Sequence, residues 1–288
     1  GSPDLPLFVW GHSMGSIAAL RKSCAHFALI KALDLGGEII TTPFSYVATC
    51  SSIVWENAKP VFVDIDPENY TIDTTKIEAA ITPKTSAILG THVYGIPCNV
   101  EEIARIAKKH KLKVIYDAAH AFGVEYKGNS LLTYGDISTL SFHATKLFHT
   151  VEGGGITTGD DELAHRIAYM RNFGHKGQEE FWGLGINGKS SEFHAAMGLC
   201  MFPQINNILE QRKRLSLLYD KYIDELKLPV KRPVIPANTN YNFSYYPVVF
   251  ESEKKLLSVK DSLVAAYIMP RRYFYPSLHT LPYITEKH

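Results

Sequence analysis

Short apolar runs rich in β-branched residues alternate with amphipathic segments from Glu38 to about residue 205. The runs are apolar on both faces, as strands of a parallel β-sheet covered by helices must be. We expect strands at residues 38–44, 61–66, 87–93, 113–119, 139–144 and 154–159.

Helical patterns separate several of these runs. Residues 99–110 start with Asn99 and carry Glu102 three positions later, which resembles a capping box at a helix start. Residues 160–172 repeat apolar side chains at helical spacing. Alternation of strands and helices predicts an α/β fold with a mainly parallel sheet.

The pattern changes after about residue 205. We expect a long amphipathic helix, a proline-rich crossing, a strand and a final helix, at residues 206–226, 229–236, 241–251 and 258–268. A chain of 288 residues is long enough for two domains. We therefore predict a large domain over residues 1–204 and a smaller α+β domain over residues 205–288.

Composition excludes several classes of function. Thirty basic residues nearly balance twenty-nine acidic ones, so no nucleic-acid surface is indicated. No apolar run is long enough for a membrane span, and no signal peptide is evident. The four cysteines lie far apart, which favours reduced thiols in a cytoplasmic protein over a zinc site or disulfides.

Polar side chains follow the expected strands at their carboxyl ends, where open α/β sheets bind ligands. They are Asp117, His120, Ser141, Lys146 and Tyr46. Pyridoxal phosphate requires this set of groups: an amine to bond its aldehyde, a carboxylate for its ring nitrogen, donors for its phosphate and an aromatic ring against its face. The sequence therefore predicts a pyridoxal-phosphate site.

Two motifs strengthen this prediction. "DAAHAFG" (117–123), followed by "SFHATKLFHTVEGGG" (141–155), resembles the paired signature of the DegT-type nucleotide-sugar aminotransferases, which are fold-type-I pyridoxal-phosphate enzymes. Supporting stretches include "EIITTPFSYVAT", "KPVFVDIDPENYTID", "THVYGIPCNVEEI", "RNFGHKG" and "INGKSSEFHAAMGL". The resemblance covers about residues 25–283.

The resemblance implies a role for each strand-end residue. Lys146 would be the Schiff-base lysine and proton shuttle, and Asp117 would pair with the pyridinium nitrogen. His120 would lie near the ring, Ser141 would bind the phosphate, and Tyr46 would stack on the ring. From the residues alone, the last three could instead have packing or turn-capping roles.

Further implications concern partners and substrates. Asn187 matches an asparagine that reaches the phosphate of a neighbouring subunit, which implies a homodimer with shared active sites. Glutamate would be the amino donor. "MPRRYFYPSL" (269–278) is similar to the branch acting at C4 of a dTDP-4-keto-6-deoxyhexose. Arg271 and Arg272 could meet the diphosphate or form a structural pair.

Both ends of the sequence depart from the family pattern. Ser23 stands where the family has a phosphate-binding threonine, although another alignment selects Ser16. The usual N-terminal helix and C-terminal tail are not evident, so we expect a sequence that is cut or altered at both ends.

Four alternatives remain. "GHSMG" (11–15) matches the nucleophile elbow of serine hydrolases, but no acid–histidine pair follows on a sheet of its own. The family's dehydratases replace the lysine with histidine, which Lys146 argues against. A cofactor-binding protein without turnover is the third. A metal site at His143 and His149 has the wrong spacing.

Overall fold

A computed structural model describes residues 17–20 and 29–285 of the chain. Its centre is a seven-stranded sheet of order β1-β9-β8-β5-β4-β2-β3. The strands are β1 (Ile17–Leu20), β2 (Glu38–Thr41), β3 (Lys59–Phe62), β4 (Thr85–Thr91), β5 (Lys113–Asp117), β8 (Ile137–Ser141) and β9 (Gly154–Thr157). β3, β2, β4, β5 and β8 are parallel to one another, whereas β9 is antiparallel to both β8 and β1. The mainly parallel sheet expected from the sequence is confirmed.

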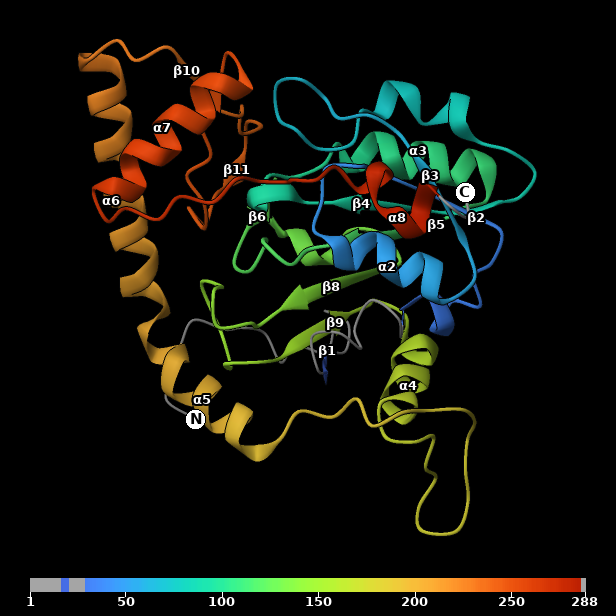
Figure 1. Cartoon of the computed structure of the whole chain (residues 1–288). Coiled ribbons are helices and arrows are strands. Elements are labelled where there is room, and N and C mark those ends of the chain that lie inside the picture. Colours follow the sequence, from blue (N-terminus) through green and yellow to red (C-terminus); the bar gives the residue numbers. More distant parts are fainter. Residues whose placement is uncertain (1–16, 21–28, 286–288) are drawn as a thin grey trace.

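Helices cover both faces of this sheet (Figure 1). They include α2 (Val47–Trp55), α3 (Val100–His110) and α4 (Asp161–Met170). Consecutive strand residues belong to different hydrophobic clusters: Ile88 packs with residues of α3, and Leu89 with residues of α2 and α4. This two-sided burial explains why the strands carry apolar side chains on both faces.

Local signals define the helix ends. Asn99 Oδ1 accepts a hydrogen bond from the Glu102 amide at 3.2 Å, which caps α3 as the sequence predicts. Asp160 caps α4 by accepting from the Leu163 amide at 3.0 Å. Lys111 ends α3 in the left-handed conformation (φ 56°).

The later part of the chain forms a separate group of elements along one side of the sheet domain (Figure 1). They are α5 (Glu192–Met201), α6 (Ile205–Glu225), β10 (Val230–Lys231), β11 (Thr239–Asn240), β12 (Val249–Phe250), α7 (Glu253–Ala265) and α8 (Pro282–Thr285). β10 pairs with β12. β11 pairs with β6 (Glu125–Tyr126), which also pairs with β7 (Asn129–Ser130). Short 3₁₀ turns lie at Thr74–Lys76, Glu78–Ala80, Val93–Gly95, Leu131–Thr133, Phe202–Gln204 and Leu278–Thr280.

The strand expected over residues 241–251 is wrong for most of its length. Only Val249–Phe250 is a strand, as β12. Phe243 has a φ of 50°, which interrupts an extended chain. Tyr241 and Asn242 use their side chains to hydrogen-bond loop carbonyls of the sheet domain instead of extending a ladder. This segment therefore joins the two parts of the molecule.

The last described residues return to the sheet domain. Leu278 and Ile284 pack with Cys50 of α2, and α8 lies beside α2 in Figure 1. The domain division at residue 205 stays a prediction; α6 starts at Ile205, but the chain beyond it contacts both parts. Across residues 17–20 and 29–285, every helix is too short or too polar to cross a bilayer.

Candidate active site

Asp117 is the last residue of β5, and only 4% of its surface is exposed. Its Oδ2 accepts a hydrogen bond from Thr49 Oγ1 at 2.7 Å, and its Oδ1 accepts from the Ala119 amide at 3.1 Å. Both bonds favour the ionised carboxylate. The structure thus fixes a buried acid at the carboxyl edge of the sheet.

A series of hydroxyl groups continues from the hydrogen bond between Thr49 and Asp117. Thr49 Oγ1 lies 2.7 Å from Ser45 Oγ, and Thr91 Oγ1 donates to Ser45 Oγ at 3.2 Å. Sequence reasoning did not single out Thr49, although it lies inside the "EIITTPFSYVAT" stretch. Thr49, Ser45 and Thr91 are all buried. Their hydrogen bonds therefore hold the Asp117 carboxylate in one orientation.

His120 is buried beside this acid, on the loop that follows β5. Its Nδ1 accepts a hydrogen bond from the Tyr94 amide at 2.9 Å, so the proton of the neutral ring is on Nε2. The ring of His120 is stacked on that of Tyr94, with 6.3 Å between the ring centroids, and its centroid lies 4.4 Å from the ring centroid of Tyr245. His120 therefore belongs to an aromatic wall and is oriented by the backbone.

Lys146 follows β8 and reaches the same wall. Its Nζ donates a hydrogen bond to the hydroxyl of Tyr245 at 3.3 Å. Tyr245 comes from the C-terminal part of the chain, 99 positions away. The lysine amine is thus held at the junction of the two parts of the molecule.

Ser141 is the last residue of β8 and is buried. Its Oγ has no hydrogen-bond partner among the residues that the structure describes. A buried hydroxyl without a partner is costly, so a ligand at this position would be stabilised by it. β5 and β8 are neighbours in the sheet, which brings Asp117 and Ser141 to one edge.

Two residues from the C-terminal part complete the wall. Asn242 Nδ2 donates to the carbonyls of His120 and Phe122 at 2.9 and 2.8 Å. The hydroxyl of Tyr241 donates to the Tyr94 carbonyl at 2.7 Å. Neither residue is marked by a strand end or a motif, so sequence reasoning missed them.

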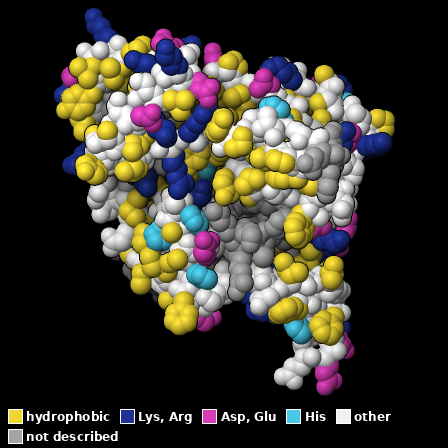
Figure 2. Space-filling model, viewed as in Figure 1, with side chains coloured by type: hydrophobic (Ala, Val, Ile, Leu, Met, Phe, Trp, Pro, Cys, Tyr) yellow, Lys and Arg dark blue, Asp and Glu magenta, His cyan; other side chains and the backbone are white. Residues whose placement is uncertain are grey.

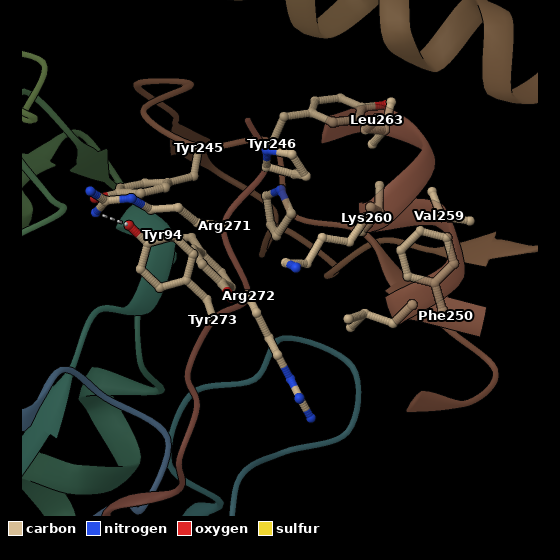
Figure 3. Close-up of a pocket in the computed structure, with 14 residues that line it drawn as sticks. Tyr94, Tyr245, Tyr246, Phe250, Val259, Lys260, Leu263, Arg271, Arg272 and Tyr273 are labelled. Atoms are coloured by element: carbon tan, nitrogen blue, oxygen red, sulfur yellow. Dashed lines mark hydrogen bonds between the residues drawn. The ribbon is translucent and has the colours of Figure 1, made fainter. Parts of the chain in front are cut away.

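A cavity of about 270 Å³ opens from Tyr94 and Tyr245 toward α7 (Figure 3). Arg271 lies at its tyrosine end, where it donates to the hydroxyl of Tyr273 at 3.5 Å. This hydrogen bond raises the pKa of Arg271, which stays charged. Lys260 extends into the cavity from α7.

The two arginines predicted to bind substrate differ in their surroundings. Arg272 also lines the cavity, but its guanidinium points away from Tyr94 and Tyr245 (Figure 3). It pairs with Glu253 at 2.6 Å and stacks on Tyr275 at 3.6 Å. Arg271 is therefore the better placed of the two to meet an anion near Lys146.

The remaining predicted residues lie at the edge of the site or beyond it. Tyr46 is the N-cap of α2, half-exposed, and close enough to Arg271 for an electrostatic interaction. Asn187 is exposed in the loop between α4 and α5, where it bridges to Asn172. Ser23, Ser16 and "GHSMG" lie outside the described residues.

A second buried histidine, His92, lies next to Asp117. The His92 amide donates to the Asp117 carbonyl at 3.0 Å, and the ring stacks on Tyr116 at 4.4 Å. Burial lowers the pKa of His92 to about 3, although the charge of Asp117 opposes this shift. His92 is therefore a neutral packing group at physiological pH.

The sequence model of the DegT/DnrJ/EryC1/StrS aminotransferase family matches residues 17–288 of this chain. The chain belongs to this family. Members of the family are pyridoxal-phosphate enzymes, which agrees with the chemistry expected from the strand ends.

Relatives within the family are similar over most of the chain. A dTDP-4-amino-4,6-dideoxy-D-glucose transaminase of Shigella dysenteriae is 45% identical over 251 residues, 86% of this chain and 68% of the relative. A GDP-perosamine synthase of Escherichia coli O157:H7 is 34% identical over 91% of this chain and 72% of its own length. The crystal structure of DesI with its TDP-sugar product superposes with a TM-score of 0.87 at 32% identity, over 94% of this chain and 70% of DesI.

The residues of this family member suit pyridoxal phosphate. Asp117 and Ser141 end the neighbouring strands β5 and β8, Lys146 follows β8, and the Ser141 hydroxyl has no partner among the described residues. These groups would offer an acceptor for a ring nitrogen, a donor for a phosphate and a nucleophile for an aldehyde.

Proposed function

We propose that the protein moves an amino group from glutamate to C4 of a dTDP-linked 4-keto-6-deoxyhexose. The observation that carries this proposal is the convergence of Lys146, Asp117 and Ser141 at the carboxyl edge of the sheet. The 45%-identical relative is a dTDP-4-amino-4,6-dideoxy-D-glucose transaminase, which supports C4 as the position and dTDP as the carrier.

Each residue has a defined task in this proposal. Pyridoxal phosphate, when bound, supplies an aldehyde that takes up an amine and a ring that accepts electrons. Lys146 would bind the cofactor and move a proton at its Nζ. The Asp117 carboxylate would hold a proton on the ring nitrogen, because a nearby negative charge favours the charged ring. Ser141 Oγ would donate to the phosphate, and His120 would pack near the ring.

The cavity next to Lys146 is the proposed substrate site. Its tyrosine wall would shield the bound sugar from water, while Arg271 would supply a charged donor. Guanidinium binds phosphate oxygens with two parallel hydrogen bonds, so Arg271 would hold the diphosphate of the sugar nucleotide. Arg272, paired with Glu253, would have the lesser role.

We further propose that the protein works as a cytoplasmic homodimer with shared active sites. Large hydrophobic side chains are exposed on the loop between α4 and α5 and on α5 itself: Phe173, Phe181, Trp182, Leu184, Ile186, Phe193 and Leu199. The loop extends away from the body of the molecule, and Figure 2 shows hydrophobic side chains on it. If a partner subunit covered these side chains, Asn187 of the same loop would reach into that subunit's active site.

Lys146→Ala tests the proposed function directly. Amino-sugar formation from glutamate and the dTDP-4-keto-6-deoxyhexose should fall below detection, because the variant lacks the amine that would bind the cofactor. Lys113→Ala, which removes a surface lysine paired with Asp136, is the matched control and should keep normal turnover. Comparable turnover in the Lys146 variant and the control would refute the proposal.

A further inference from the structure

Tyr245 occupies the point where the catalytic lysine meets the C-terminal part of the chain. Its hydroxyl accepts a hydrogen bond from Lys146 Nζ at 3.3 Å, and Nζ lies 5.9 Å from its ring centre. The ring also packs on His120 at 4.4 Å. Tyr245 thus contacts the lysine and the aromatic wall together.

Aromatic and charged neighbours surround the Tyr245 hydroxyl. The ring of Tyr245 packs edge-on against that of Tyr273, with 5.8 Å between the ring centroids, and the Tyr273 hydroxyl accepts from Arg271 at 3.5 Å. A guanidinium can only donate, whereas a phenol has one donor and two acceptor sites. Tyr245 can therefore accept from a lysine ammonium or donate to a neutral lysine amine while it keeps its place.

The backbone around Tyr245 is anchored on both parts of the molecule. Asn242 binds two carbonyls of the loop after β5, and Arg212 of α6 donates to the Ser244 carbonyl at 3.0 Å. Fixed backbone on the preceding residues leaves the ring little freedom to move away from Lys146.

Tyr245 keeps its own proton. Burial raises its pKa well above the usual range, with smaller contributions from Tyr273 and from the opposing charges of Arg212 and Arg271. The groups that face it are His120, Lys146, Tyr94, Tyr273, Arg212 and Arg271. A phenol that does not ionise can hold a lysine but cannot act as its base.

We propose that Tyr245 is a positioning residue that holds the Lys146 amine at the cofactor site whenever this amine has no covalent partner. The inference rests on the proposed function, in which Lys146 would release the cofactor in the amino-donor half of the reaction and take it back at the end of the amino-acceptor half. A free lysine side chain has about 2 kcal/mol of rotamer entropy, so an unheld amine would return more slowly.

The test measures how fast protein freed of cofactor captures pyridoxal phosphate at Lys146. Capture joins Nζ to the aldehyde carbon and releases one water. Borohydride then fixes the bond by adding hydride to that carbon, and peptide mass spectrometry counts the modified Lys146 at each time. Quenching of protein fluorescence measures non-covalent binding of the cofactor separately.

Tyr245→Phe should slow capture about 10-fold while non-covalent affinity changes less than about 2-fold, since the hydrogen bond removed is worth about 1.4 kcal/mol. Tyr273→Phe, which keeps the ring packed against Tyr245 but removes the hydroxyl that binds Arg271, should slow capture by a smaller factor. Tyr134→Phe is the matched control, because its hydroxyl bonds the Tyr126 carbonyl far from Lys146; it should capture cofactor at the parent rate.

The outcomes separate this inference from the proposed function. If the parent protein captures no cofactor at Lys146, the proposed function itself fails. If the parent captures it and Tyr245→Phe does so at the rate of Tyr134→Phe, only the role of Tyr245 is refuted. Equal melting temperatures of the two variants would exclude misfolding as the reason for slow capture by Tyr245→Phe.

Discussion

A single carboxylate shows how residue-scale contacts set the chemistry of the site. Asp117 receives one hydrogen bond from a backbone amide and one from Thr49, a residue of a different element. The first bond comes with the turn after β5, and the second depends on the docking of α2. The carboxylate is therefore aimed by tertiary structure as well as by its place at a strand end.

Asp117→Asn should reduce the amino-donor half-reaction by about 100-fold or more, because an amide gives no charge to hold a proton on the ring nitrogen. Folding should change little, since an amide of the same shape replaces the carboxylate. Single-turnover absorbance with glutamate measures the rate, and thermal unfolding measures the stability. An unchanged rate would show that Asp117 is only structural.

Thr49→Val removes the hydroxyl donor while keeping the shape of the side chain. We expect an intermediate loss, about 10-fold in the same half-reaction, because a hydrogen bond to a charged group is worth about 1.5–3 kcal/mol and part of it is replaced by water. Ser51→Ala is the matched control on the same helix, since Ser51 bonds Tyr283 instead. Equal rates for both variants would contradict a role for Thr49 in holding Asp117.

His92 should make stability depend on pH. Its folded pKa of about 3 lies below the ordinary 6.5, so between these values the unfolded chain binds a proton that the folded chain does not. The free energy of unfolding should therefore fall as the pH drops through this window, by about 2 kcal/mol from this group at pH 5.

His92→Asn tests this prediction, because Asn keeps an acceptor for the Cys98 amide that His92 Nδ1 now binds at 3.1 Å. Urea unfolding at pH 7 and pH 5 should show a smaller loss of stability in the variant than in the parent. The same loss in both proteins would mean that other groups cause it.

The sequence predicts the strand-end residues but not their partners. Asp117, Ser141 and Lys146 follow apolar runs, so their common edge comes directly from the parallel sheet. Tyr245 is 99 positions from Lys146, and Asn242 is 122 positions from His120. Such contacts depend on how separate elements dock, which no local pattern records.

At the scale of elements, prediction succeeds where burial is two-sided and regular. The six strands expected between Glu38 and Gly159 are present, with ends that differ by a few residues. The sequence did not predict α2. This helix packs against the sheet on one side and against Leu278 and Ile284 on another, so its sequence lacks a single apolar stripe. The irregular segment from Tyr241 was taken for a strand because its aromatic residues are common in strands.

The segment after β11 (Thr239–Asn240) acts as the joint between the two parts, and Asn242 is its anchor. Asn242→Asp would place an oxygen against the carbonyls of His120 and Phe122 in a site that is 1% exposed. We expect a loss of about 2–4 kcal/mol in the free energy of unfolding, because buried donors are lost and like partial charges face each other.

Asn240→Asp is the comparison for this anchor, since Asn240 lies two positions earlier and its side-chain amide donates to Glu125 at the exposed surface. Chemical denaturation of both variants gives the result. A loss of stability at Asn242 no larger than at Asn240 would mean that the two parts are held together elsewhere.

At the scale of the whole molecule, the loop between α4 and α5 projects away from the body of the chain (Figure 1). That loop carries Asn187 and several of the exposed hydrophobic side chains. Its shape is constrained by Gly174, which has a φ of 79° and no room for a side chain beside the Gly183 carbonyl. A rigid, apolar loop of this kind is suited to a contact with a second copy of the chain.

Subunit exchange tests whether Asn187 acts across such a contact. Lys146→Ala and Asn187→Ala proteins should each be impaired alone. In a mixed dimer, one site would carry both defects and the other neither. About a quarter of all sites should then be intact, since about half of the dimers are mixed and one of their two sites is restored. Lys146→Ala mixed with Asp117→Asn is the control: these residues serve the same site from one subunit, so every mixed dimer keeps one defect in each site and no activity should return. If exchange is confirmed and the first mixture is as inactive as the control, Asn187 acts within its own subunit and the shared-site dimer is wrong.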